Sequence, residues 1–186
     1  MRFSTFAALF TLHVNPLAGQ ASWYGAATAR VCAEGIRELS SAAVRESRAA
    51  PETIVVNATR LVLKVSAFMN LQPGMILRPG DTLPARCKDI APLDLHFVLT
   101  SADSSDLPPH ISLDSAWVVG QGHAFAAIVA TWGASTSDSA RRLARHIWGS
   151  PWWVTKEPIS LVAQVRTGDG HRYLLRSPVF KVEIVE

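Results

Sequence analysis

The stretch PISLVAQVRTGDGHRYLLRSP, residues 158–178, contains two alternating apolar runs that meet at a glycine-rich turn. Successive side chains of a β-strand point to opposite faces, so the apolar residues of the first run share one face: Ile159, Leu161, Ala163 and Val165. Glycine adopts the positive φ angles that tight hairpin turns require. The stretch therefore predicts a β-hairpin in which Gly168 and Gly170 both have positive φ.

A third apolar run ends the sequence. Phe180, Val182 and Ile184 alternate with charged residues, which is the pattern of a half-buried strand. Pro178 lacks a backbone amide donor, and a sheet edge tolerates that loss. We expect this strand to close one edge of a β-sandwich.

Further strands are predicted upstream of the hairpin. The alternating residues 53–69 are too many for one ordinary strand, so we expect a break near Asn57. Each of two Pro-Gly dipeptides, beginning at Pro73 and Pro79, favours a type II turn. The other predicted strands are residues 75–77, residues 94–99, and residues 111–119 paired through a turn at 120–122 with residues 123–132.

Two helices are predicted beside these strands. Residues 28–47 are alanine-rich, lack proline and carry an imperfect helical stripe of apolar side chains. A short helical insertion is predicted at about 138–148, where Ser137 or Asp138 can cap the start and Gly149 ends the helix. Its apolar face follows the i, i+3, i+4, i+7 pattern and comprises Ala140, Leu143, Ala144 and Ile147.

The last part of the chain, about residues 111–186, resembles the end of immunoglobulin-like sandwiches in exported bacterial proteins of unknown function. The resemblance lies in a tryptophan-containing Gly/Pro loop, an alternating strand, Gly-Asp-Gly, Tyr-Leu-Leu-Arg and a last apolar strand. It implies a mainly β chain, an immunoglobulin-like antiparallel β-sandwich with an N-terminal helix and the short helical insertion. It is architectural and assigns no site residues.

The first residues are typical of a signal peptide. Arg2 precedes a short apolar run, and small residues stand where a signal peptidase cleaves, so we expect the mature chain to begin near Ser22. Export to a periplasm or the extracellular space follows, and an organelle transit peptide is the alternative. The run is too short for a membrane span. The expected organisation is a signal peptide at 1–21, a helical segment at 22–50 and the sandwich at 51–186.

Charge and cysteine content narrow the function classes further. The formal net charge of +3 is too small an excess to indicate nucleic-acid binding. Cys32 and Cys87 are the two cysteines, and export predicts that they form a disulfide; two unpaired thiols are the alternative. Both are misplaced for the inter-sheet disulfide of antibody-type domains.

The densest unusual composition lies at residues 146–153, beside the arginines of the predicted insertion helix. Tryptophans can anchor a protein partner, stack on a sugar or seal a core. A one-sided apolar helix would turn its arginines outward. We therefore assign a hypothetical binding surface to five residues: Arg141, Arg145, Trp148, Trp152 and Trp153.

Catalytic and metal signatures are sparse. The sequence contains no nucleophile elbow, phosphate-binding glycine loop or tight histidine ligand spacing, so no catalytic residue, metal ligand or cofactor is assigned. Asp94 and His96 form the nearest approach to a ligand pair, and adjacent strands could add His110 and His123. Asp103 and Asp106 lie in a serine-rich loop, where turn bonding is their common role and a calcium site is the alternative.

These observations predict an exported, non-enzymatic binding or assembly module that contacts another macromolecule, with a protein as its partner. The first alternative is a carbohydrate-binding module that uses the segment from Trp148 to Trp153 to bind a glycan. The second is a metal-dependent hydrolase built on His96, His110 and His123.

Overall fold

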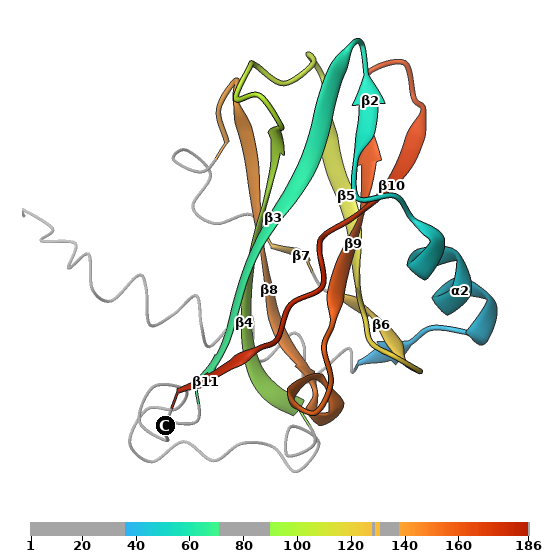
Figure 1. The fold of residues 1–186 in the computed structure, drawn as a ribbon, viewed down its shortest axis with the longest axis vertical. Helices are drawn as coiled ribbons and strands as arrows, with labels where there is room; N and C mark the ends of the chain where they lie inside the picture. The colour runs from blue at the N-terminus through green and yellow to red at the C-terminus, as the bar shows by residue number, and fades with distance from the viewer. Residues whose placement is uncertain (1–35, 71–89, 128, 131–137, 186) are drawn as a thin grey trace, which may run out of the picture.

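The computed structural model describes residues 36–70, 90–127, 129–130 and 138–185. Within these ranges, two mainly antiparallel β-sheets pack face to face as a β-sandwich, and one α-helix lies beside them (Figure 1). The predicted signal peptide, both cysteines and the predicted strand 75–77 lie outside the described residues. No helix in the described ranges is long and apolar enough to cross a membrane.

One sheet has five strands, and all its neighbours are antiparallel. Their order across the sheet is β1 (Arg37–Glu38), β6 (Ala124–Ala127), β5 (Ser112–Val119), β9 (Ser160–Arg166) and β10 (Arg172–Arg176).

The other sheet has six strands and carries the site described below. Its order is β11 (Glu183–Val185), β3 (Thr59–Asn70), β4 (Ile90–Ser101), β8 (Arg142–Pro151) and β7 (Val129–Ala130), with β2 (Ile54–Val56) paired to β3. Among the strands of the described ranges, β11 alone runs parallel to its neighbour, β3.

The core lies between the two sheets because alternate residues of each strand turn inward. Leu99 and Ile147 from the six-stranded sheet and Leu161 and Val165 from the five-stranded sheet are fully buried in it. Burying a side chain of this size stabilises the fold by about 1.5–3 kcal/mol.

Helix α2 (Ser41–Ala49) covers the outer face of the five-stranded sheet, where Val44 packs in a second cluster with Val119 and Val162. The predicted helix at 28–47 is confirmed for residues 41–47, but it begins later than predicted, because Arg37 and Glu38 form strand β1. Ser40 determines the start, since its hydroxyl accepts a hydrogen bond from the Ala43 amide.

The terminal hairpin is confirmed, because β9 and β10 pair antiparallel. Gly170 has a φ of 87°, as predicted. The same prediction for Gly168 is wrong, since its φ lies outside the positive range. Gly168 instead fits a close approach: a Cβ there would lie 2.8 Å from the Cβ of His110.

The C-terminal strand lies at an edge of a sheet, as expected. After Pro178 the chain crosses from the five-stranded sheet to β3, and only Glu183–Val185 form the strand β11. Phe180 still bridges to Ile159 of the hairpin segment through two backbone hydrogen bonds. The C-terminal segment therefore contacts both sheets: Phe180 bonds to Ile159, and β11 pairs with β3.

The predicted helical insertion at 138–148 is wrong, because this segment forms β8 in the middle of the six-stranded sheet. Leu143 and Ile147 fit a helical stripe, but they also share one face of a strand. Strand β8 pairs along most of its length with β4, and this pairing satisfies its backbone hydrogen-bonding groups. The β-sandwich prediction holds, with an additional inner strand in place of the insertion.

Two further hairpins agree with the sequence. The break near Asn57 is a tight turn in which Asn57 and Ala58 have φ of 48° and 64°. Strands β5 and β6 also form the expected hairpin. The strand predicted at 123–132 is divided, however, because β6 belongs to the five-stranded sheet and β7 to the six-stranded sheet.

Candidate functional site

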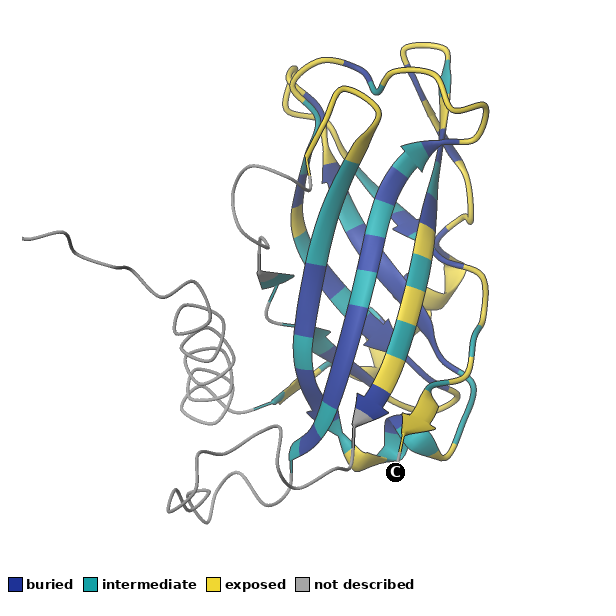
Figure 2. Ribbon diagram, turned by 90° about the vertical axis from the view of Figure 1, so that its left-hand side faces the viewer, coloured by how far each residue is buried: buried dark blue, intermediate teal, exposed yellow. Residues whose placement is uncertain are grey.

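The candidate site lies on the outer face of the six-stranded sheet, which faces the viewer in Figure 2. Leu95 and Ile147 are paired and buried in the core, so the residues beside them on β4 and β8 point the other way. Strand register then forms two rows on the outer face. The first is Phe68–Asp94–Trp148 and the second is Ser66–His96–His146, read from β3 to β8.

Asp94, His96 and His146 form a compact cluster in these rows. Each offers one potential ligand atom, and the three atoms lie within 4.8 Å of one another. The Nε2 atom of His146 is in hydrogen-bond contact with Oδ1 of Asp94, and Nε2 of His96 lies 3.9 Å from the same oxygen. The centroids of the two imidazole rings are 4.6 Å apart.

The cluster is buried on one side and open on the other. The side chains of Asp94 and His146 are each 6% exposed, whereas that of His96 is 34% exposed. Burial lowers the pKa of His96 below its ordinary value; the charge of His146 lowers it further, and Asp94 opposes both. Neutral imidazole, the form that offers a lone pair to a cation, is therefore favoured at His96.

Two imidazoles and one carboxylate are a donor set for a divalent transition metal. Zn²⁺ binds histidine nitrogen and aspartate oxygen, and other first-row ions also accept imidazole ligands. Ca²⁺ and Mg²⁺ prefer oxygen ligands and fit this set less well. Three protein ligands leave at least one coordination position for water or another molecule.

The sequence anticipated only part of this cluster. His96 is the member of the predicted histidine trio that the structure places in it, next to Asp94. His110 lies instead against Gly168, and the ring of His123 stacks on Trp153 with centroids 5.4 Å apart. His146 was missed as a ligand because its segment was predicted to be helical, which hid its register with His96.

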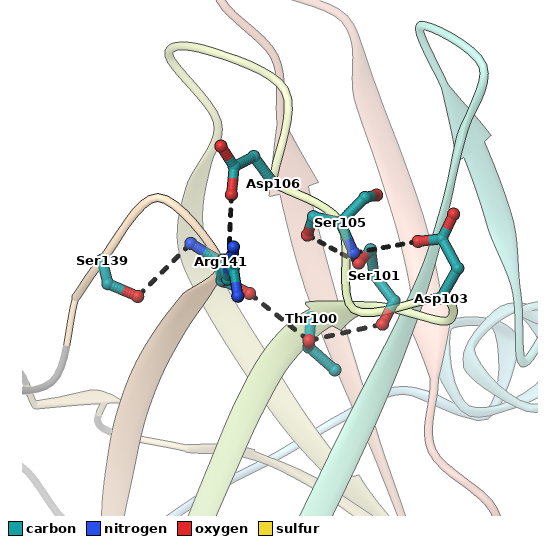
Figure 3. Close-up of polar contacts among 7 residues, drawn as sticks. All are labelled: Thr100, Ser101, Asp103, Ser105, Asp106, Ser139 and Arg141. Carbon is teal, nitrogen blue, oxygen red and sulfur yellow. Dashed lines mark hydrogen bonds and ion pairs between the residues drawn. The ribbon is translucent and has the colours of Figure 1, made fainter.

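The two arginines of the predicted binding surface lie in different surroundings. Arg141 is 75% exposed, and its Nε lies 3.2 Å from Oδ1 of Asp106 (Figure 3). Arg145 is only 11% exposed, because it shares the face of β8 that carries Ile147 and its Nη1 binds Asp138 at 2.7 Å. The expectation that the helix turns both arginines outward is wrong for Arg145.

The three tryptophans do not form one platform. Trp148 lies on the outer face of β8, and the centroid of its ring is 5.9 Å from that of the His146 ring. Trp152, in the 3₁₀ helix η2 (Trp152–Thr155), is 42% exposed. Trp153 packs on the core, and the centroid of its ring is 6.0 Å from that of the Phe125 ring. Packing accounts for Trp153; a partner-facing role for the other two stays a prediction.

The serine-rich loop uses its carboxylates in turn and ion-pair contacts (Figure 3). Oδ1 of Asp103 accepts a hydrogen bond from the Ser105 amide at 3.1 Å, which is the predicted Asx-type contact. Hydrogen bonds from Ser105 also lower the pKa of Asp103. Asp106 binds Arg141 and so connects the loop to the start of β8. These contacts favour a structural role for both carboxylates.

No protein-family model matches this chain. No curated protein is significantly similar to it in sequence. Among solved structures, an uncharacterised β-sandwich protein from Clostridium difficile 630 is similar, with 14% identity and a TM-score of 0.31. The match covers 69% of this chain and 91% of that one.

Proposed function

We propose that this chain is an exported, non-enzymatic binding module that holds one divalent transition-metal ion between Asp94, His96 and His146. The observation that carries the proposal is the convergence of these three ligand atoms to within 4.8 Å on one sheet face. The predicted signal peptide supports export.

The sheet supports such a site because it holds all three ligands on paired strands. Asp94 and His96 are two residues apart on β4, and His146 is the direct partner of His96 on β8. Ladder hydrogen bonds fix this register, so the ligands are held close together without relying on a loop. The near-complete burial of Asp94 and His146 further restricts their side chains.

Zinc binding to purified protein tests the proposal. We expect one equivalent of Zn²⁺ by calorimetry, with affinity reduced at least about tenfold by Asp94→Asn and by His146→Ala, because each removes a ligand. The matched control is His171→Ala, which removes the exposed histidine that lies 3.8 Å from Asp169. Circular dichroism reports whether each variant folds. Folded Asp94 and His146 variants that bind zinc as tightly as the wild type would refute the proposal.

Metal-dependent hydrolysis is the second candidate, and the same cluster favours it. A zinc ion with three protein ligands can hold a water molecule whose pKa is lowered to about 7. Zinc-dependent turnover of p-nitrophenyl acetate or phosphate that is lost in His146→Ala would show that the protein is an enzyme and would refute the proposal of a non-enzymatic binding module. The absence of turnover by the zinc-loaded protein would leave the binding module.

The tryptophan arrangement gives no support to the carbohydrate-binding alternative, because Trp153 packs on the core while Trp148 lies on the outer face of β8. Tryptophan fluorescence tests the carbohydrate-binding alternative directly. Soluble glycans should alter tryptophan fluorescence if the segment binds sugar and leave it unchanged otherwise.

A further inference from the structure

We infer that the metal ion completes its coordination with a carboxylate from an acidic segment of another protein, which docks along β3 on the outer face of the six-stranded sheet. The inference rests on the proposed metal site and names the class of partner that it would serve.

The accessible side of the cluster is its β3 side. His146 is buried between β4 and β7, whereas His96 is about one-third exposed and lies beside the exposed residue Ser66. Phe68, beside Asp94, is itself 38% exposed. A donor group from outside the protein would therefore reach the ion over β3, next to Ser66 and Phe68.

The charge of this side favours an anion. Histidine coordinates a metal through an uncharged imidazole, so the Asp94 carboxylate alone would offset only one of the two charges of a divalent ion. On β3, Arg60 and Lys64 lie on the same face and are exposed, and neither forms an ion pair with another described residue. Lys64 is the diagonal neighbour of His96, and such neighbours are about 7–8 Å apart. Positive charge near the open position attracts a carboxylate and its acidic neighbours.

The face also indicates the length and direction of the segment. Glu183 pairs with Phe68 and places a negative charge beside the C-terminal part of β3. An acidic segment would therefore extend along β3 in the opposite direction, toward Lys64 and Arg60. Outer-face positions on a strand recur about every 7 Å. An extended segment with one carboxylate on the ion and further acids over Lys64 and Arg60 fits this spacing.

A protein segment suits the site better than a sugar chain. The exposed ring of Phe68 offers an apolar contact beside the ion, and aromatic side chains are enriched at protein interfaces. Of the described tryptophans, Trp153 packs against Phe125 of the core and Trp148 lies beside His146. The test below also measures binding of an acidic polysaccharide, so that a glycan partner can be distinguished from a protein.

Cobalt-substituted protein provides the test, because the visible spectrum of Co²⁺ reports its ligands. The probe is a fluorescein-labelled octaglutamate peptide at physiological salt. We expect the peptide to bind only when Co²⁺ is present and to change the cobalt spectrum. Lys64→Glu should weaken peptide binding about fivefold or more through charge repulsion without lowering Co²⁺ affinity, since an added carboxylate near the ion can only attract the cation. The control is Arg172→Glu, which reverses an exposed charge on β10 of the other sheet.

Each other outcome has one meaning. If Co²⁺ binds without using Asp94, His96 and His146, the proposed metal module itself is wrong. If it binds there but the peptide leaves the spectrum unchanged, or binds equally without metal, only the inference about the partner is overturned. Binding of polygalacturonate in place of the peptide would also overturn it, since the partner would then be a glycan.

Discussion

Replacing Gly168 with alanine tests whether this residue is required for space or for its backbone angle. An added Cβ would lie 2.8 Å from the Cβ of His110 and 3.5 Å from its Cγ. The φ of Gly168 is outside the positive range, so alanine should meet no backbone strain there. Crowding against His110 is therefore the expected source of instability.

The size of the effect follows from this contact. Forcing extra atoms into a packed region typically costs about 1–3 kcal/mol. Because the crowding atom is a Cβ, His110→Ala would not relieve it but His110→Gly would. In the His110→Gly background, Gly168→Ala should cost close to nothing, since alanine also lowers the entropy of the unfolded chain. The coupling energy between the two changes should thus be about 1–3 kcal/mol.

Urea denaturation of the four proteins of this cycle measures the coupling. Gly170→Ala is the matched control, because Gly170 has a φ of 87° but no atom within 4 Å of an added Cβ. It should lose about 1–2 kcal/mol of stability from backbone strain in both backgrounds. A Gly168→Ala variant as stable as wild type, or one whose loss persists in the His110→Gly background, would refute the packing argument.

Three further outcomes are expected. Zinc at about 100 times its dissociation constant should raise the unfolding free energy by about 2.7 kcal/mol in wild type and much less in Asp94→Asn, and thermal melts with and without zinc check this. Trp153→Ala should destabilise the fold by about 3–5 kcal/mol because its ring packs on the core, whereas Trp152→Ala should cost less than about 1 kcal/mol; similar losses would contradict the packing described. Hydrogen bonds from the Thr167 hydroxyl and then the His171 amide lower the pKa of Asp169, so its contribution to stability is present above its ordinary value of 3.8 and is lost as pH falls through the lower folded pKa. Denaturation from pH 2 to 6 should therefore show a shallower acid loss for Asp169→Asn, and an unchanged profile would contradict the assignment.

The hairpins were predictable because their signals are local. Strands β9 and β10 alternate on either side of a turn that contains Gly170, and the break between β2 and β3 falls at Asn57 as expected. In each case the pairing partner is a few residues away, so side-chain alternation and turn chemistry are sufficient. The β-sandwich class followed from the number and spacing of such units.

Strand β8 shows where local signals fail. Leu143 and Ile147 are compatible with one face of a helix and with one face of a strand, so periodicity alone cannot separate the two structures. Strand β4 determines that this segment is a strand, because its backbone hydrogen-bonding groups pair with those of β8. Such pairing overrides helix propensity, because tertiary contacts contribute more to stability than the small propensity differences among residues.

The sequence by itself determined the strands and turns of the β2–β3, β5–β6 and β9–β10 hairpins and the Asp94-x-His96 pair on one strand face. Only the tertiary structure decided that His146, which is 52 positions beyond Asp94 in the chain, joins that pair. The physical reason is register: a shift of one residue between β4 and β8 would turn His146 to the core side. Register depends on hydrogen bonds and packing between distant segments, and no local pattern of residues 138–148 specifies it.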